Sequence, residues 1–128
     1  MNNFIKGYAD DAALDIVLED ILEIKPGYQT IELPCTYTPG PNEVAFLIAR
    51  SSTAKQGIFP IPVAIDAGYE GIIHAFVINT TDRRVVFDKG ERAFSIVNLV
   101  KGQDRAKCTI AKPGKRGSNW NNSSGGTK

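Results

Sequence analysis

The sequence predicts one all-β domain, a sandwich or barrel of short strands. The chain has 128 residues, which is the size of a single ordinary domain. Runs of strand length, rich in Ile, Val, Phe and Thr, alternate with turn signals built from Pro, Gly, Asn and Asp. No long helical pattern occupies the body of the chain. Such a series of short strands is typical of β-sandwiches and barrels.

The predicted strands lie between the turn signals. They cover residues 29–33, 43–49, 71–79, 84–87 and 93–100. Residues 58–63 are a weaker case, because Pro60 and Pro62 have no N–H to donate to a sheet ladder. We therefore expect an edge strand or an irregular connection there.

Residues 13–22 do not fit the β pattern. Apolar side chains fall at positions 14, 17, 18, 21 and 22, which is helical spacing. Asp10 or Asp11 is available as an N-cap just before this segment. Periodicity alone therefore predicts a helix over 13–22.

Composition excludes several classes of protein. The net charge of +1 argues against a surface built for nucleic acid or an acidic membrane. No apolar run approaches the roughly 20 residues of a membrane span. The N-terminal residues lack a secretory segment, so we expect a cytoplasmic protein. Cys35 and Cys108 are too few for a disulfide scaffold and are expected to be buried thiols, and the single His74 excludes sites that need several imidazoles.

Charge is unevenly distributed along the chain. Residues 112–128 carry four cations and no acid, whereas residues 1–111 carry eleven cations and fourteen acids, a net charge of −3. We therefore divide the chain into a β domain, 1–111, and a flexible basic arm rich in Gly, Ser and Asn, 112–128. The arm contains Arg116 and the lone Trp120. A guanidinium, an aromatic face and backbone N–H groups together can wrap a nucleotide.

Arg50, Ser51 and Ser52 directly follow the apolar run 45–49, where a strand is expected to end. Hydroxyl and backbone N–H groups at such a turn can hold phosphate oxygens, and an arginine can orient or pair with a carboxylate. A plain turn is the alternative interpretation.

Residues 64–71 place a carboxylate and an aromatic ring on one tight hairpin. Asp66 follows an apolar pair, and Tyr69 stands between two glycines. The alternative interpretation is an Asp-initiated turn with a glycine at the position of positive φ. Residues 89–92 similarly read as a turn before a buried strand.

In their order and spacing, these segments resemble the five motifs of the trimeric dUTPase family. The counterparts are Ala12-Ala13-Leu14-Asp15-Ile16, Arg50-Ser51-Ser52, residues 65–71, residues 90–95, and Arg116-Gly117 with residues 120–127. The third motif, Ile-Asp-x-x-Tyr-x-Gly, is met without exception. The resemblance covers nearly the whole chain.

The resemblance implies a dUTPase-like β-clip, a distorted jelly-roll barrel, assembled as a homotrimer with its sites at subunit interfaces. It also implies hydrolysis of dUTP to dUMP and pyrophosphate with Mg²⁺. Residues 13–24 become largely extended under this interpretation, against the helical periodicity.

The resemblance further implies roles for ten residues. Asp66 would activate the water that attacks the α-phosphorus, Tyr69 would pack beneath the deoxyribose, and Asp15 would hold the water shell of the metal. The remaining substrate-binding positions are Arg50, Ser51, Ser52, Gly71, Arg92, Arg116 and Trp120.

The sequence departs from the family before the third motif, in the fourth, and in the fifth, where Trp120 comes one residue early and Asn121-Asn122 stand where glycine is common. Residues 59–64 contain neither the Asn nor the Gly with which the family's hairpin reads uracil, and Ser95 replaces a glutamine. A different deoxynucleotide substrate and a non-catalytic, partner-binding role therefore remain alternatives. The related dCTP deaminases share a motif similar to residues 66–71, but they place a catalytic glutamate where this chain has Phe76.

Overall fold

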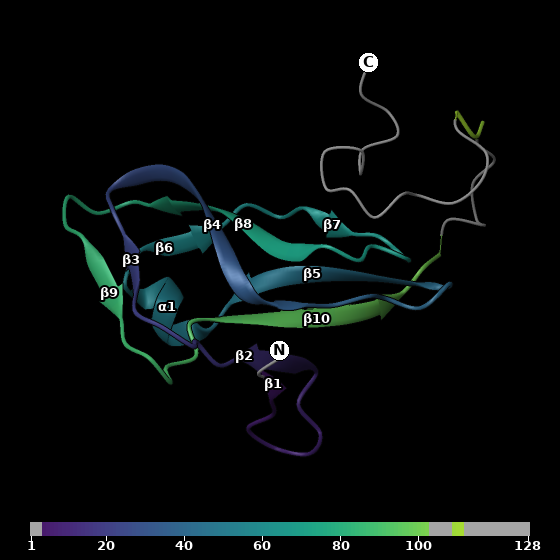
Figure 1. The fold of residues 1–128 in the computed structure, drawn as a ribbon, viewed down its shortest axis with the longest axis horizontal. Helices are drawn as coiled ribbons and strands as arrows, with labels where there is room; N and C mark the ends of the chain where they lie inside the picture. The colour runs from purple at the N-terminus through teal and green to yellow at the C-terminus, as the bar shows by residue number, and fades with distance from the viewer. Residues whose placement is uncertain (1–3, 103–108, 112–128) are drawn as a thin grey trace.

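A computed structural model of the protein describes residues 4–102 and 109–111. The described chain is almost entirely β-structure (Figure 1). A five-stranded sheet has the strand order β1-β2-β10-β5-β7, a three-stranded sheet has the order β4-β8-β6, and β3 pairs with β9. All neighbouring pairs are antiparallel. The all-β prediction is confirmed.

The strands are short, as their sequence runs indicate. Their bounds are β1 Phe4–Ile5, β2 Ala13–Ile16, β3 Leu22–Ile24, β4 Gly27–Thr36, β5 Glu43–Ala49, β6 Ile58–Pro60, β7 Ala64–Ile65, β8 Ile72–Asn79, β9 Val85–Phe87 and β10 Phe94–Val100. Each of the five predicted runs contains a strand. The proline-containing β6 lies at the edge of its sheet, where a missing N–H costs no ladder bond.

The helix predicted over 13–22 is wrong. Residues 13–16 form β2, which lies between β1 and β10 and pairs with both. The same segment also has apolar side chains at positions 14, 16 and 18, the alternation of a strand, and two of them, Ile16 and Leu18, are buried. Pairing on both sides satisfies the backbone of β2, and this tertiary context overrides the helical periodicity. The extended conformation implied by the family resemblance is confirmed.

One short helix was not predicted. Helix α1, Ser51–Lys55, begins immediately after β5, where the sequence suggested only a turn. It contains one fully buried residue, Thr53, whose hydroxyl donates a hydrogen bond of 2.7 Å to the carbonyl of Ala93. Five residues are too few to display an apolar period, so no periodicity could have predicted α1.

The core is formed by apolar side chains from most strands. Its fully buried members include Ile16, Ile24, Leu33, Ile58, Val77, Phe94 and Ile96. Cys35 is a buried free thiol, as expected, and burial raises its pKa to about 11. Cys108 and the arm at 112–128 lie outside the described residues. Within 4–102 and 109–111, no helix is long and apolar enough to cross a membrane.

Candidate functional site

The turn between β7 and β8 carries an exposed carboxylate and an anchored aromatic ring. The Tyr69 N–H donates to the Asp66 carbonyl at 3.1 Å, and Gly68 adopts a positive φ of 82° that favours glycine. The Tyr69 hydroxyl donates to the Ile72 carbonyl at 2.8 Å, and the Thr38 hydroxyl donates to the Tyr69 carbonyl at 2.8 Å. Tyr69 is only 7% exposed, whereas Asp66 is exposed at the tip of the turn. The turn therefore holds Tyr69 in one position and directs Asp66 to solvent.

Gly71 lies too close to this ring to carry a side chain. A Cβ at this position would lie 2.5 Å from the Tyr69 hydroxyl oxygen and 2.8 Å from its Cζ. We expect Gly71→Ala to displace Tyr69 and to lower the free energy of unfolding by about 1–3 kcal/mol in denaturant titrations. Gly102→Ala is the matched control, because a Cβ there meets no atom within 4 Å. Equal stabilities of the two variants would contradict this steric account.

A second cluster joins three of the sequence motifs around Asp15. Its Oδ2 atom lies 3.4 Å from Arg50 Nε and 3.4 Å from Arg92 Nη1. Its Oδ1 atom accepts a hydrogen bond of 2.5 Å from the Ser95 hydroxyl. One carboxylate thus orients two guanidinium groups that are each about one-third exposed.

Strand pairing places these side chains together. Ser95 on β10 stands opposite Asp15 on β2 and opposite Ile48 on β5, and it is 3% exposed. Arg50, at the end of β5, donates from its backbone N–H to the Ala93 carbonyl at 3.2 Å and from Nη1 to the Arg92 carbonyl at 3.0 Å. The role of Ser95 was missed from sequence, since a lone serine in an apolar strand gives no signal of its partner.

The two clusters lie far apart within one chain. Ile65, the neighbour of Asp66, pairs with Ala45 near the start of β5. Arg50 follows five residues further along, roughly 17 Å away at the rise of a β-strand. Figure 1 shows β7 and α1, which begins with Ser51 and Ser52, toward opposite ends of β5. One subunit therefore does not bring Asp66 to Arg50, Ser51 or Ser52.

The surroundings of Asp15 do not suit a metal-binding role. Two positive groups stand 3.4 Å from the same oxygen and would repel a divalent cation or its ordered water. Among the described residues, no three His, Cys, Asp or Glu side chains gather as a set of metal ligands. The magnesium role of Asp15 stays a prediction that this geometry does not favour. Arg116 and Trp120 lie outside the described residues.

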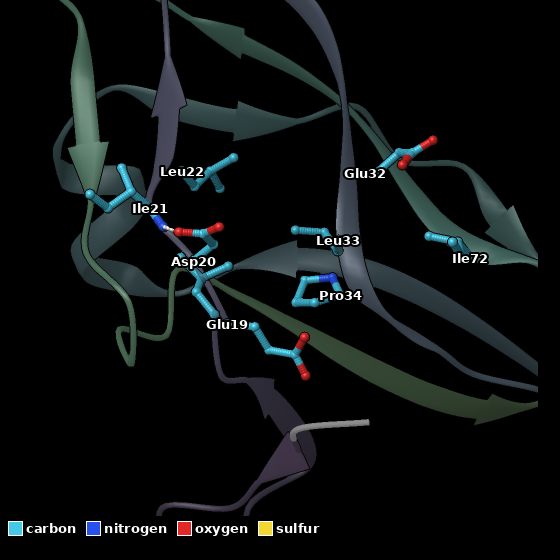
Figure 2. Close-up of a pocket in the computed structure, with 9 residues that line it drawn as sticks. Glu19, Asp20, Ile21, Leu22, Glu32, Leu33, Pro34 and Ile72 are labelled. Atoms are coloured by element: carbon cyan, nitrogen blue, oxygen red, sulfur yellow. Dashed lines mark hydrogen bonds between the residues drawn. The ribbon is translucent and has the colours of Figure 1, made fainter. Parts of the chain in front are cut away.

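A groove of about 390 Å³ is lined by neither Asp66 and Tyr69 nor Asp15 and its arginines (Figure 2). Its walls are the segment 18–22 and residues 32–34 of β4, with Ile72 at one end. Three carboxylates line it, those of Glu19, Asp20 and Glu32. These carboxylates would repel a triphosphate electrostatically, so the groove is not the candidate nucleotide site.

Comparison with known proteins decides the family. The dUTPase family model matches residues 2–124, nearly the whole chain. This chain belongs to the dUTPase family. The dUTPase of EIAV has the same fold, with a TM-score of 0.72 and 20% identity over 90% of this chain and 96% of that chain. The Streptococcus mutans dUTPase gives a TM-score of 0.66 and 29% identity over 76% of this chain and 84% of that one.

Curated relatives outside the dUTPases also match this dUTPase-family chain. The dCTP deaminase of Pyrobaculum calidifontis is 32% identical over 103 residues, which is 80% of this chain. The match spans 58% of the length of that deaminase. The comparisons therefore agree on family and fold, whereas the names of the matched proteins point to two different activities.

Proposed function

We propose that the protein hydrolyses dUTP to dUMP and pyrophosphate, with Asp66 as the base that activates the attacking water. The geometry of the 65–71 turn is the observation that carries this proposal. Water is a poor nucleophile toward phosphorus, so a positioned carboxylate has to accept its proton as the attack begins. Asp66 is exposed on a turn in which Tyr69 is anchored, an arrangement that suits this role.

The fixed ring of Tyr69 supports the proposal, because it offers a surface on which the sugar of the nucleotide can pack. Its hydroxyl is held by the Ile72 carbonyl, and Gly71 lies directly against the ring. In this proposal a deoxyribose packs on the ring, and the 2′-hydroxyl of a ribose would collide with it. In this proposal the turn selects a deoxynucleotide and holds it close to Asp66, the proposed base.

The phosphate-binding side of the site belongs, in this proposal, to a second copy of the chain. Arg50, Ser51 and Ser52 lie at the far end of β5 from Asp66, so association of copies is needed to complete the site. Mg²⁺ bound to the triphosphate would neutralise phosphate charge. Arg50 and Arg92, oriented by Asp15, would pair with the remaining phosphate oxygens.

The outer face of the three-stranded sheet suits such an assembly. Tyr28, Ile78 and Phe59 stand opposite one another on β4, β8 and β6 and form one exposed apolar row. Burial of this row against another copy would be favourable. We propose a homotrimer, in which Arg116 and Trp120 of the arm at 112–128 close over the bound nucleotide.

Deamination of dCTP is the activity suggested by the curated relatives, and one residue argues against it. Phe76 lies on β8. From the motif that the deaminases share with residues 66–71, this is the position at which they carry their catalytic glutamate. A phenylalanine neither accepts nor donates a proton. We therefore favour hydrolysis.

The test measures pyrophosphate and ammonia separately, with Mg²⁺ present, from dUTP and from dCTP. We expect rapid pyrophosphate release from dUTP, no ammonia from dCTP, and by light scattering a mass of three times the 13.9 kDa subunit. Ammonia release from dCTP would replace hydrolysis by deamination. Absence of both products would leave a binding protein on this fold.

A further inference from the structure

We propose that the groove in Figure 2 is the docking site of the chain's own basic arm, residues 112–128, in the nucleotide-free protein. The carboxylates of the groove pair with cations of the arm, and its apolar surface packs against the ring of Trp120. The proposed hydrolysis does not use this groove, so the proposal does not depend on that function. When a nucleotide binds, the arm leaves the groove and closes over it, as proposed above.

The groove carries negative charge on both of its walls. Glu19 and Asp20 lie on the segment 18–22, and Glu32 lies on β4, across the groove (Figure 2). All three are exposed, and no lysine or arginine is among the described residues that line the groove. The Nε2 atom of His74 lies 3.5 Å from Glu32 Oε2, and it offsets part of this charge only when the ring is protonated. The groove therefore attracts cations.

The carboxylates do not form a metal site. Among the described residues, no three His, Cys, Asp or Glu side chains gather as metal ligands. One oxygen of Asp20 in addition accepts a hydrogen bond of 2.9 Å from the Ile21 N–H. Anionic groups that are spread along a groove suit a ligand with several spaced cations, such as a basic peptide, better than a single ion.

Apolar side chains lie between these charges. Figure 2 shows Leu22 on one wall and Leu33 and Pro34 on the other, with Ile72 at one end of the groove. Ile72 is 46% exposed, although it is a large apolar residue. Exposed apolar surface beside separated carboxylates suits a segment that combines cations with an aromatic ring.

The arm at 112–128 has this composition. It carries four cations and no acid, and three of those cations, at 112, 115 and 116, closely precede Trp120. Trp120 is also the one tryptophan of the chain. A single short stretch of the arm therefore supplies both the charge and the ring that the groove lacks.

The chain that follows β10 is long enough to reach the groove. The start of β10 lies near the groove, because the Leu18 N–H donates to the Glu91 carbonyl at 3.0 Å and the Gly90 N–H donates to the Leu18 carbonyl at 2.8 Å. From there β10 carries the chain roughly 20 Å. Residues 103–120 span up to about 60 Å when extended. Length therefore permits docking within one subunit and between neighbouring copies.

The contact is expected to be reversible. An exposed ion pair shifts such an equilibrium by at most about fivefold, so a few pairs hold the arm only weakly. Salt at about 1 M reduces the Debye length to about 3 Å and screens these pairs. The arm is thus held in the groove at low salt and remains available to a bound triphosphate.

Carbodiimide cross-linking of the full chain without nucleotide tests the contact, because this zero-length reagent joins an amine to a carboxylate that touches it. We expect mass-spectrometric mapping to find Lys112 or Lys115 joined to Glu19, Asp20 or Glu32 at low salt. These links should become at least about fivefold rarer at about 1 M salt.

The fluorescence of Trp120 gives a second readout. Because the chain has one tryptophan, quenching by acrylamide reports on the arm alone. We expect Trp120 to be shielded at low salt and to be quenched as readily as N-acetyltryptophanamide at high salt.

A double variant locates the contact. Glu19→Gln with Glu32→Gln removes two carboxylates and keeps the hydrogen bond of Asp20. It should lower the docking equilibrium constant by up to about 25-fold, so that Trp120 is readily quenched even at low salt. Glu23→Gln is the matched control, because Glu23 is an exposed acid that follows the segment 18–22 but does not line the groove. It should change neither the links nor the quenching.

Four results would overturn the proposal. They are the absence of links between arm and groove, a Trp120 that is fully quenchable at low salt, equal shielding in the double variant and the wild type, and links from the groove to lysines in the body of a second copy. The last result would assign the groove to an interface between copies. Neither readout involves turnover, so failure to hydrolyse dUTP would refute the proposed function and leave this docking site intact.

Discussion

Asp66→Asn is expected to lower kcat for pyrophosphate release by about 10²–10⁴-fold, the contribution of a general base to proton transfer. The amide has nearly the shape of the carboxylate but does not accept a proton from water. Tyr69 should keep its position, because the hydrogen bonds of its N–H, carbonyl and hydroxyl do not use the Asp66 carboxylate. The KM for dUTP should therefore change little.

Steady-state kinetics and a denaturant titration check this result together. Asp82→Asn is the matched control, since Asp82 is an exposed aspartate on the loop that follows β8. We expect Asp82→Asn to keep wild-type kcat and both variants to keep wild-type stability. An Asp66→Asn variant with wild-type kcat would exclude Asp66 as the base.

Asp15→Asn is expected to lower the free energy of unfolding by about 1–3 kcal/mol, since hydrogen bonds to a charged group contribute in that range. The variant leaves two adjacent guanidinium groups, Arg50 and Arg92, with no charge between them. The estimate allows for solvent screening, because both arginines are about one-third exposed. Weaker binding of dUTP should accompany the loss, because neither arginine is then held toward the phosphates.

Glu23→Gln is the matched control for this charge removal. Glu23 Oε2 pairs with Arg84 Nη1 at 2.8 Å, a shorter contact than those of Asp15, but the pair is exposed and joins only two side chains. Exposed pairs contribute about 0–1 kcal/mol, so this variant should be nearly neutral in denaturant titrations. If Glu23→Gln proves the more destabilising, the proposed importance of the Asp15 cluster is wrong.

Much of the fold could be predicted because local signals and tertiary pairing agree. The strands β5, β8 and β10 are apolar runs bounded by turns, and each forms where expected. The helix prediction for residues 13–22 failed because the apolar residues of this segment fit both a helical period and, at 14, 16 and 18, the alternation of a strand. Pairing with the neighbouring β1 and with β10, which is distant in sequence, decides between helix and strand.

The candidate site was predictable in its parts but not in its arrangement. The spacing of residues 65–71 indicated both the turn and the exposed Asp66. No sequence rule showed that Asp15 would bind Ser95 and two arginines, because these contacts join residues as many as 80 positions apart. The expectation that Asp15 serves a metal came from resemblance, and the contacts around it favour a positioning role.

The position of Asp66 and Arg50 at opposite ends of β5 has a genetic consequence in the proposed assembly. Each reaction centre draws its base from one polypeptide and its phosphate-binding arginine from another. Two alleles, one lacking the carboxylate and one lacking the guanidinium, would then complement each other when co-expressed. Mixed assemblies would contain centres in which both contributions are intact, although neither gene product is active alone.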